Sequence, residues 1–182
     1  MQHPFLDAVR DGTLPATAFA GWLTQDALFV RDLLGFQARL LARAPRGAER
    51  VLAGGLVSLV DELDWFDEQA RAGGLDLAVA PLPVTTAYAD LLGRLDAARY
   101  PVAITALWAL ERVYLLGWQH AAPGAPAFRD CVQHWTDPGF AAYVTALGDL
   151  ADAAGAPPDA VAEVLALEAA FWGAAVDGGA TG

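Results

Sequence analysis

Apolar residues recur at intervals of three and four along most of the chain, which is the spacing of one helix face, and strand-like alternation is nearly absent. The long segments are rich in Ala, Leu, Arg and Glu, all of which favour helix. We therefore predict an all-α fold with one domain at residues 1–176 and a flexible tail at 177–182. The predicted helices span residues 4–11, 15–43, 46–73, 83–96, 100–119, 125–135, 137–154 and 157–176.

Several helix boundaries have a physical cause in the sequence. Asp137 followed by Pro138 has the pattern of an N-cap with proline at the first helical position. The pair Gly73-Gly74 is expected to end a helix, because glycine adopts the left-handed conformation without steric cost. The prolines Pro81 and Pro83 keep the intervening segment extended and separate two helices.

Four acidic residues fall within apolar helix stripes, where a carboxyl group is costly unless it is paired or hydrogen-bonded. Asp26, Glu111 and Glu168 each have large apolar residues one turn before and one turn after. Glu62 has a more polar stripe and could lie at a wet helix edge. Burial raises the pKa of a carboxyl group, so several such acids in a bundle indicate an interior polar site, although Glu111 could instead make a structural hydrogen bond.

Composition and charge exclude several classes of protein. The net charge is −11 and the eleven basic residues, all arginine, are scattered, so we expect no binding to nucleic acid or to an anionic membrane. A single cysteine excludes an internal disulfide and agrees with a cytoplasmic location. We also expect neither a signal peptide nor a transmembrane span.

Metal, heme and nucleophile signals are weak. None of the three histidines, His3, His120 and His134, follows one of the stripe acids at the spacing of a dinuclear iron motif, so we expect no metal and no cofactor. Cys131 lies three residues before His134 and could share a helix face with it. No acid or amide is placed nearby to orient that histidine, so a buried, inert cysteine is the favoured interpretation.

An ordered set of motifs over nearly the whole chain resembles the TenA family of thiamin-salvage proteins. The segments that carry this resemblance are His3-Pro4-Phe5, Asp11-Gly12-Thr13-Leu14-Pro15, Trp22-Leu23-Thr24-Gln25-Asp26, Pro83-Val84-Thr85-Thr86-Ala87-Tyr88, Ala106-Leu107-Trp108-Ala109-Leu110-Glu111 and Leu167-Glu168-Ala169-Ala170-Phe171-Trp172. The resemblance implies a multi-helix bundle of the heme-oxygenase type without heme, assembled as a homo-oligomer. It also implies a small pyrimidine ligand, with Asp26 binding the pyrimidine, Tyr88 in the pocket wall and Glu168 as the acid/base.

The sequence departs from the family pattern at the nucleophile. Ala106 stands at the position of the family cysteine, and Leu110 at that of a tyrosine one turn later. Phe29 and Trp135 also stand where family tyrosines are common. The walls therefore stay aromatic, which suffices for stacking on a flat ring, but they lose hydroxyl groups.

The run from Trp108 to Tyr114 resembles a branch that lacks the cysteine and is linked to hydrolysis of formylated aminopyrimidines or of the aminopyrimidine itself. Glu111 is rotated by about 140° from Ala106 on an ideal helix and cannot replace the thiolate, whereas it lies about 60° from Tyr114 and could pair with it.

We expect a hydrolase in which a carboxylate activates water. The predicted catalytic residues are Glu168, Glu111 and Asp26, and the predicted substrate-binding residues are Asp26, Phe29, Tyr88, Trp108, Tyr114, Trp135 and Phe171. Two alternatives stay open: a non-catalytic pyrimidine-binding or aromatic-ligand-binding protein, and a cofactorless oxidase of the same fold. A transcription regulator fits poorly with the acidic charge and the absence of a recognition helix.

Overall fold

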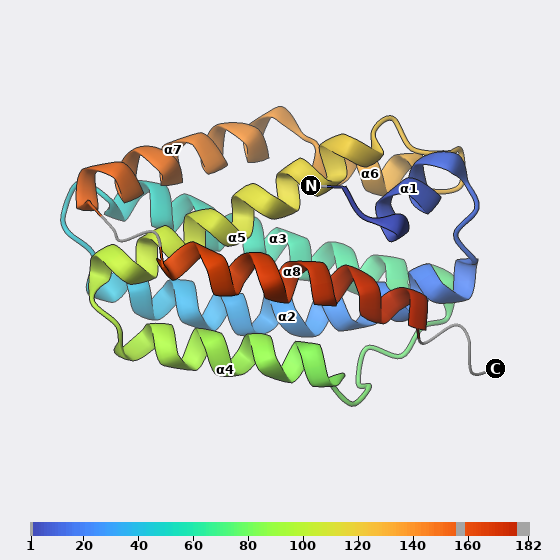
Figure 1. Cartoon of the computed structure of the whole chain (residues 1–182), viewed down its shortest axis with the longest axis horizontal. Helices are drawn as coiled ribbons and strands as arrows, with labels where there is room; N and C mark the ends of the chain where they lie inside the picture. The colour runs from blue at the N-terminus through green and yellow to red at the C-terminus, as the bar shows by residue number, and fades with distance from the viewer. Residues whose placement is uncertain (1, 156–158, 178–182) are drawn as a thin grey trace.

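The computed structural model describes residues 2–155 and 159–177, and within these ranges the chain forms helices and no strands, which confirms the all-α prediction. None of the helices in these ranges is long and apolar enough to cross a bilayer. The predicted tail lies outside the described residues, except for Asp177 at the end of the last helix. The helices are α1 (Pro4–Asp11), α2 (Ala16–Ala42), α3 (Glu49–Gly73), α4 (Pro83–Ala97), α5 (Tyr100–Ala121), α6 (Arg129–Trp135), α7 (Pro138–Ala154) and α8 (Asp159–Asp177) (Figure 1).

The predicted helix boundaries hold where a cap fixes them. The Asp137 side chain accepts a hydrogen bond from the Gly139 amide at 2.7 Å, and α7 begins at Pro138. Helix α3 ends at Gly73, and Gly74 follows in the left-handed conformation with φ 65°. Helix α6 begins later than predicted, because the segment before it closes a turn with the Phe128 amide donating to the Ala125 carbonyl at 2.9 Å.

Helices α2 and α5 form the centre of the bundle. Helix α2 packs against α3, α4 and α8, and α5 packs against α1, α6, α7 and α8. Figure 1 shows the long helices running roughly along one axis, with α4 and α7 at opposite edges and the short α1 and α6 at one end. Side chains from α2, α3, α5 and α7 therefore meet in the interior.

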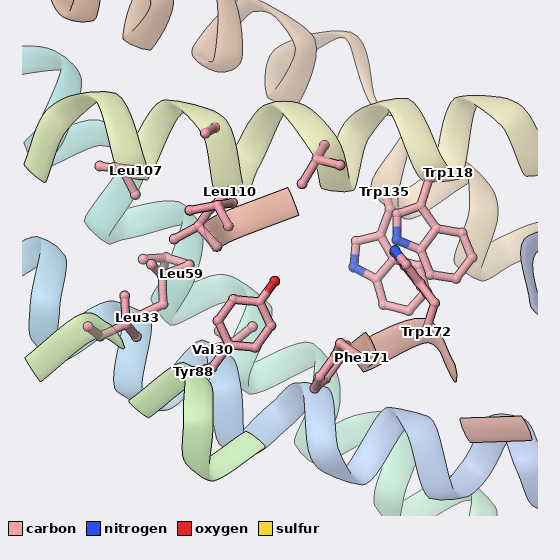
Figure 2. Packing of buried hydrophobic residues seen from close by; sticks show 14 of the residues in the cluster. Val30, Leu33, Leu59, Tyr88, Leu107, Leu110, Trp118, Trp135, Phe171 and Trp172 are labelled. Carbon is pink, nitrogen blue, oxygen red and sulfur yellow. The ribbon is translucent and has the colours of Figure 1, made fainter. Parts of the chain in front are cut away.

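The core divides into an aromatic end and an aliphatic end. Trp22 stacks on Trp172 with ring centroids 5.3 Å apart, and it meets the edges of Trp118 and Trp135 at 5.3 and 5.4 Å. Figure 2 shows Trp118, Trp135 and Trp172 gathered together, apart from an aliphatic group that includes Leu33, Leu59 and Leu110. Tyr88 and Phe171 lie between the two groups in this view. The tryptophan-rich packing makes one end of the interior dense, and the polar interior described below adjoins it.

A polar chain joins α7, α2 and α3 beside the aliphatic group. The Tyr143 hydroxyl donates to Gln37 Oε1 at 3.0 Å, and Gln37 Nε2 donates to the Leu52 carbonyl at 2.9 Å. Gln37 is fully buried, so these bonds satisfy an amide that would otherwise be costly. Gly55 allows this approach, because a Cβ atom at that position would overlap the Gln37 amide and the Tyr143 hydroxyl.

This close approach predicts that Gly55→Ala destabilises the protein by about 1–3 kcal/mol, since the methyl group displaces Gln37 or Tyr143. Gly54→Ala is the matched control, because a Cβ atom at Gly54 meets open space and alanine favours helix by up to about 1 kcal/mol. Urea denaturation of both variants measures the difference. Equal stability of the two variants would contradict the account of this contact.

Candidate functional site

A cavity of about 420 Å³ lies between α2, α3, α5, α6, α7 and α8. Its solvent-exposed lining residues, which we call the mouth, are Ser58, Asp61, Gln133, Asp137 and Gly139. The cavity thus opens between α3 and the junction of α6 with α7. The remaining lining residues are Asp26, Phe29, Val30, Leu33, Gly55, Leu59, Glu62, Leu110, Glu111, Tyr114, His134, Trp135, Phe140, Tyr143 and Glu168.

The structure brings the three predicted catalytic acids, Asp26, Glu111 and Glu168, to this one cavity. They come from α2, α5 and α8, and their exposed fractions are only 1%, 8% and 4%. Each lies on the inward stripe of its helix, as the spacing predicted. We call them the three buried acids, and they give an otherwise apolar interior its polar character.

Burial raises the pKa of all three carboxyl groups. The pKa of Glu111 rises to about 8, first through desolvation and then through the negative charges of Glu62 and Glu168. The pKa of Glu168 rises to about 7 through desolvation, partly offset by the hydrogen bond from Tyr88. Desolvation also raises the pKa of Asp26 well above its ordinary range, against the lowering effect of the bond from Tyr114. Neutral, protonated forms are therefore available near pH 7.

Two tyrosine hydroxyls hold two of these acids. Tyr88 donates to Glu168 Oε2 at 2.5 Å, and Tyr114 donates to Asp26 Oδ2 at 2.9 Å. Tyr114 therefore does not pair with Glu111, although the helix geometry allowed it, because its hydroxyl donates to Asp26 on α2. Glu111 makes no side-chain hydrogen bond within residues 2–155 and 159–177.

The predicted aromatic residues occupy three different places. Phe29, Trp135 and Tyr114 line the cavity. Tyr88 and Phe171 stand behind the lining and pack against Phe29, with ring centroids 4.7 and 6.1 Å from it.

Trp108 lies elsewhere on α5. The structure does not bring it to the cavity, since its indole faces α7, where Gly148 leaves room for Nε1.

Ala106, to which the resemblance assigns the position of the family cysteine, is not part of the cavity lining. Ala106 is fully buried, and Leu110 one turn later forms the wall. Cys131 does not take over as a nucleophile, because burial raises the pKa of its thiol to about 11 and its neighbour His134 bonds to Glu62 instead. Covalent catalysis by a cysteine therefore has no candidate in this cavity.

Sequence reasoning left Glu62 and His134 out of the site. Glu62 Oε2 lies 2.8 Å from His134 Nε2, and Glu62 Oε1 accepts a hydrogen bond from Trp135 Nε1 at 2.6 Å. Glu62 was visible as an acid next to apolar residues, but nothing in the sequence showed that α3 and α6 meet. The pair therefore became apparent only from the fold.

The charge around the cavity is one-sided. Its described lining contains six acidic residues, one histidine and no arginine. Within the described part of the chain, no group of three or more His, Cys, Asp and Glu residues has the arrangement of a metal site. A single histidine does not favour the cofactorless-oxidase alternative, which would need several basic side chains. The acids instead favour a ligand that presents N–H donors or positive charge.

The model of the TENA/THI-4/PQQC family matches residues 1–177. A relative from Glycine max, described as "Probable bifunctional TENA-E protein", is 35% identical over 163 residues, which cover 83% of this chain and 71% of that protein.

Solved structures share the fold. A TenA homologue from Pyrococcus furiosus superposes with a TM-score of 0.89 at 24% identity, over 95% of this chain and 90% of that one. A TenA homologue from P. horikoshii gives 0.88 at 20% identity, over 97% and 91%. On the family match and the curated relative, the chain belongs to the TENA/THI-4/PQQC family.

Proposed function

We propose that the chain hydrolyses an aminopyrimidine or a formylaminopyrimidine by means of carboxylate-activated water. The observation that carries this proposal is the meeting of Asp26, Glu111 and Glu168 at one cavity with aromatic walls. Membership of the family supports a thiamin-related role in general. The substrate class comes from the resemblance to the branch without the cysteine, and the walls of aromatic rings and carboxyl groups are compatible with a flat ring that carries N–H donors.

In this proposal Glu168 is the general base and Glu111 the general acid. The hydrogen bond from Tyr88 favours the ionised form of Glu168, whereas Glu111 accepts no such bond and has the higher pKa, about 8 against about 7. Near pH 7 the pair can therefore hold one proton on Glu111 while Glu168 is partly ionised. Two carboxyl groups whose environments separate their pKa values form a usual acid–base pair.

The reaction then follows from these roles. Glu168 takes a proton from water as the oxygen attacks the electrophilic carbon of the substrate. As the carbon–nitrogen bond breaks, Glu111 protonates the departing nitrogen, so that water is the only species consumed. Transfer of the proton from Glu168 to Glu111, directly or through the product amine, restores the starting state. Asp26, with its raised pKa, holds the pyrimidine through its ring nitrogen and amino group.

A non-catalytic binder is the second candidate, and a specific observation favours it. Leu110 stands where the family pattern contains a hydroxyl, so the α5 wall of the cavity is apolar at that position, while Ala106, where the pattern contains the thiol, lies outside the lining. A pyrimidine that raises the melting temperature without being turned over would support this candidate. Binding of a small pyrimidine is common to both candidates, and assembly into a homo-oligomer stays a prediction.

The hydrolase proposal predicts that Glu111→Gln and Glu168→Gln each lower kcat about 10²- to 10⁴-fold with both formylaminopyrimidine and aminopyrimidine. The amide keeps the size of the side chain but neither takes nor gives the proton. Glu163→Gln, an exposed change on the same helix as Glu168, serves as the control and keeps wild-type rates. Wild-type turnover in both site variants would rule out these assignments.

The raised pKa values also predict how stability changes with pH. The folded state keeps protons on Glu111 and Glu168 up to about pH 8 and 7, whereas unfolded glutamate loses its proton near pH 4.5. The free energy of unfolding should therefore be highest below about pH 4.5 as far as these groups contribute, and fall as pH rises toward 8. The expected loss is on the order of 5 kcal/mol for Glu111 and on the order of 3 kcal/mol for Glu168.

Urea denaturation at pH 5, 7 and 9 measures this fall. Glu111→Gln should make the fall smaller by the contribution of Glu111, because an amide does not ionise and Glu168 still does, while Glu163→Gln should leave the fall unchanged. Stability that stays level or increases between pH 5 and 9 in the wild type would show that these carboxyl groups are not held in their neutral forms.

A further inference from the structure

Glu62 holds two side chains of α6 at the cavity wall. Each carboxylate oxygen makes one contact: Oε2 lies 2.8 Å from His134 Nε2, and Oε1 accepts a hydrogen bond from the Trp135 indole at 2.6 Å. The Glu62 side chain is 19% exposed, which makes it more open than the three buried acids. Glu62 therefore fixes α6 to α3 with two bonds next to the mouth.

His134 is held on a second side as well. Its ring stacks on Trp65 with centroids 4.3 Å apart and planes 8° from parallel. Stacking fixes the plane of the imidazole, and the Glu62 contact fixes its rotation within that plane. His134 also lines the cavity, with its side chain 31% exposed.

The contact with Glu62 also determines which nitrogen is available. When the imidazole is neutral and its Nε2 donates to Glu62, the proton is on Nε2 and the free lone pair is on Nδ1. Within the described residues, His134 Nδ1 has no hydrogen-bond partner. The atom is not fully buried, so a ligand can approach it. A carboxylate that orients a histidine in this way is a common means of presenting the other nitrogen for binding or proton transfer.

We propose that His134, oriented by Glu62, is a ligand-contacting residue of the cavity that accepts a hydrogen bond through Nδ1 from an N–H or O–H group of the bound molecule. This rests on the proposed function in one respect, namely that a small aromatic molecule occupies the cavity. It adds a neutral acceptor close to the mouth to the acids of the interior. The ligand class it selects is a heteroaromatic ring with a donor-bearing substituent directed toward the mouth.

The acidic residues around His134 also favour a ligand with a donor group near the mouth. Asp61 and Asp137 line the mouth, and the negative charge of Glu62 acts on both Asp26 and Glu111. A donor group that enters at the mouth therefore meets carboxyl groups there and in the interior. His134 is the one histidine among the described lining residues, and a neutral imidazole accepts a hydrogen bond at one ring nitrogen while the other donates.

The test uses the folded wild-type chain with ¹⁵N-labelled histidine and an unlabelled aminopyrimidine or formylaminopyrimidine. Only three histidines contribute signals, and His134→Gln and His120→Gln assign two of them. We expect the free protein to show His134 as the Nε2–H tautomer. Saturating ligand should shift the His134 Nδ1 resonance while the signals of His3 and His120 stay in place.

Binding affinity gives a second readout. Loss of one hydrogen bond predicts that His134→Gln weakens binding about tenfold. His120→Gln is a matched control, because His120 Nε2 also lies 2.8 Å from a carboxylate, that of Asp7, but away from the cavity. It should leave the affinity unchanged. Glu62→Gln should weaken binding and mix the His134 tautomers, since the orienting charge is lost.

The outcomes separate this inference from the proposed reaction. Ligand that binds without moving the His134 signals, or equal affinities of wild type and His134→Gln, overturns the inference. Ligand that shifts Nδ1 but is not hydrolysed supports the inference and removes the hydrolase. Absence of binding by either pyrimidine overturns both. If His134→Gln fails to fold, His3→Gln and His120→Gln assign the His134 signals by elimination, and the wild-type spectra then decide.

Discussion

Carboxyl groups that share an apolar interior without an arginine are the constraint on which the rest of this structure depends. Desolvation penalises the ionised forms of Asp26, Glu111 and Glu168, and the negative charge of Glu62 adds repulsion for Asp26 and Glu111. The fold accommodates them by raising their pKa values and by supplying hydroxyl donors from Tyr88 and Tyr114. Such a local conflict in an otherwise consistent sequence is typical of a functional site.

The aromatic packing supplies the rigidity that this site needs. Trp22, Trp118, Trp135 and Trp172 pack face to face and edge to face, and Trp135 also donates to Glu62 at the cavity wall. The same residue thus belongs both to the core and to the site. Groups held in this way lose little additional freedom when a flat ligand binds, and preorganisation of this kind favours affinity and proton transfer.

The fold and the three buried acids could be predicted because both depend on local spacing. The positions of Asp26, Glu111 and Glu168 within apolar stripes, and the caps at Asp137 and Gly74, need only neighbouring residues to be recognised. Contacts between helices could not be predicted in the same way. The spacing of residues did not show that His134 contacts Glu62 or that Trp108 faces α7. It also did not show that the Tyr114 hydroxyl donates to Asp26 and not to Glu111. These contacts depend on how the helices pack against one another, and the spacing of residues along the chain does not reveal that packing.

The described cavity lining contains no cysteine, so its chemistry rests mainly on acids, and the central claim is that these acids recognise the ligand. A crystal structure of the chain saturated with an aminopyrimidine tests it most directly. The account predicts the ring beside Phe29 and Trp135, with ring or amino nitrogens within about 3.2 Å of the carboxyl oxygens of the three buried acids. A ring bound outside this cavity, or inside it with no nitrogen in reach of any carboxyl group, would contradict the account.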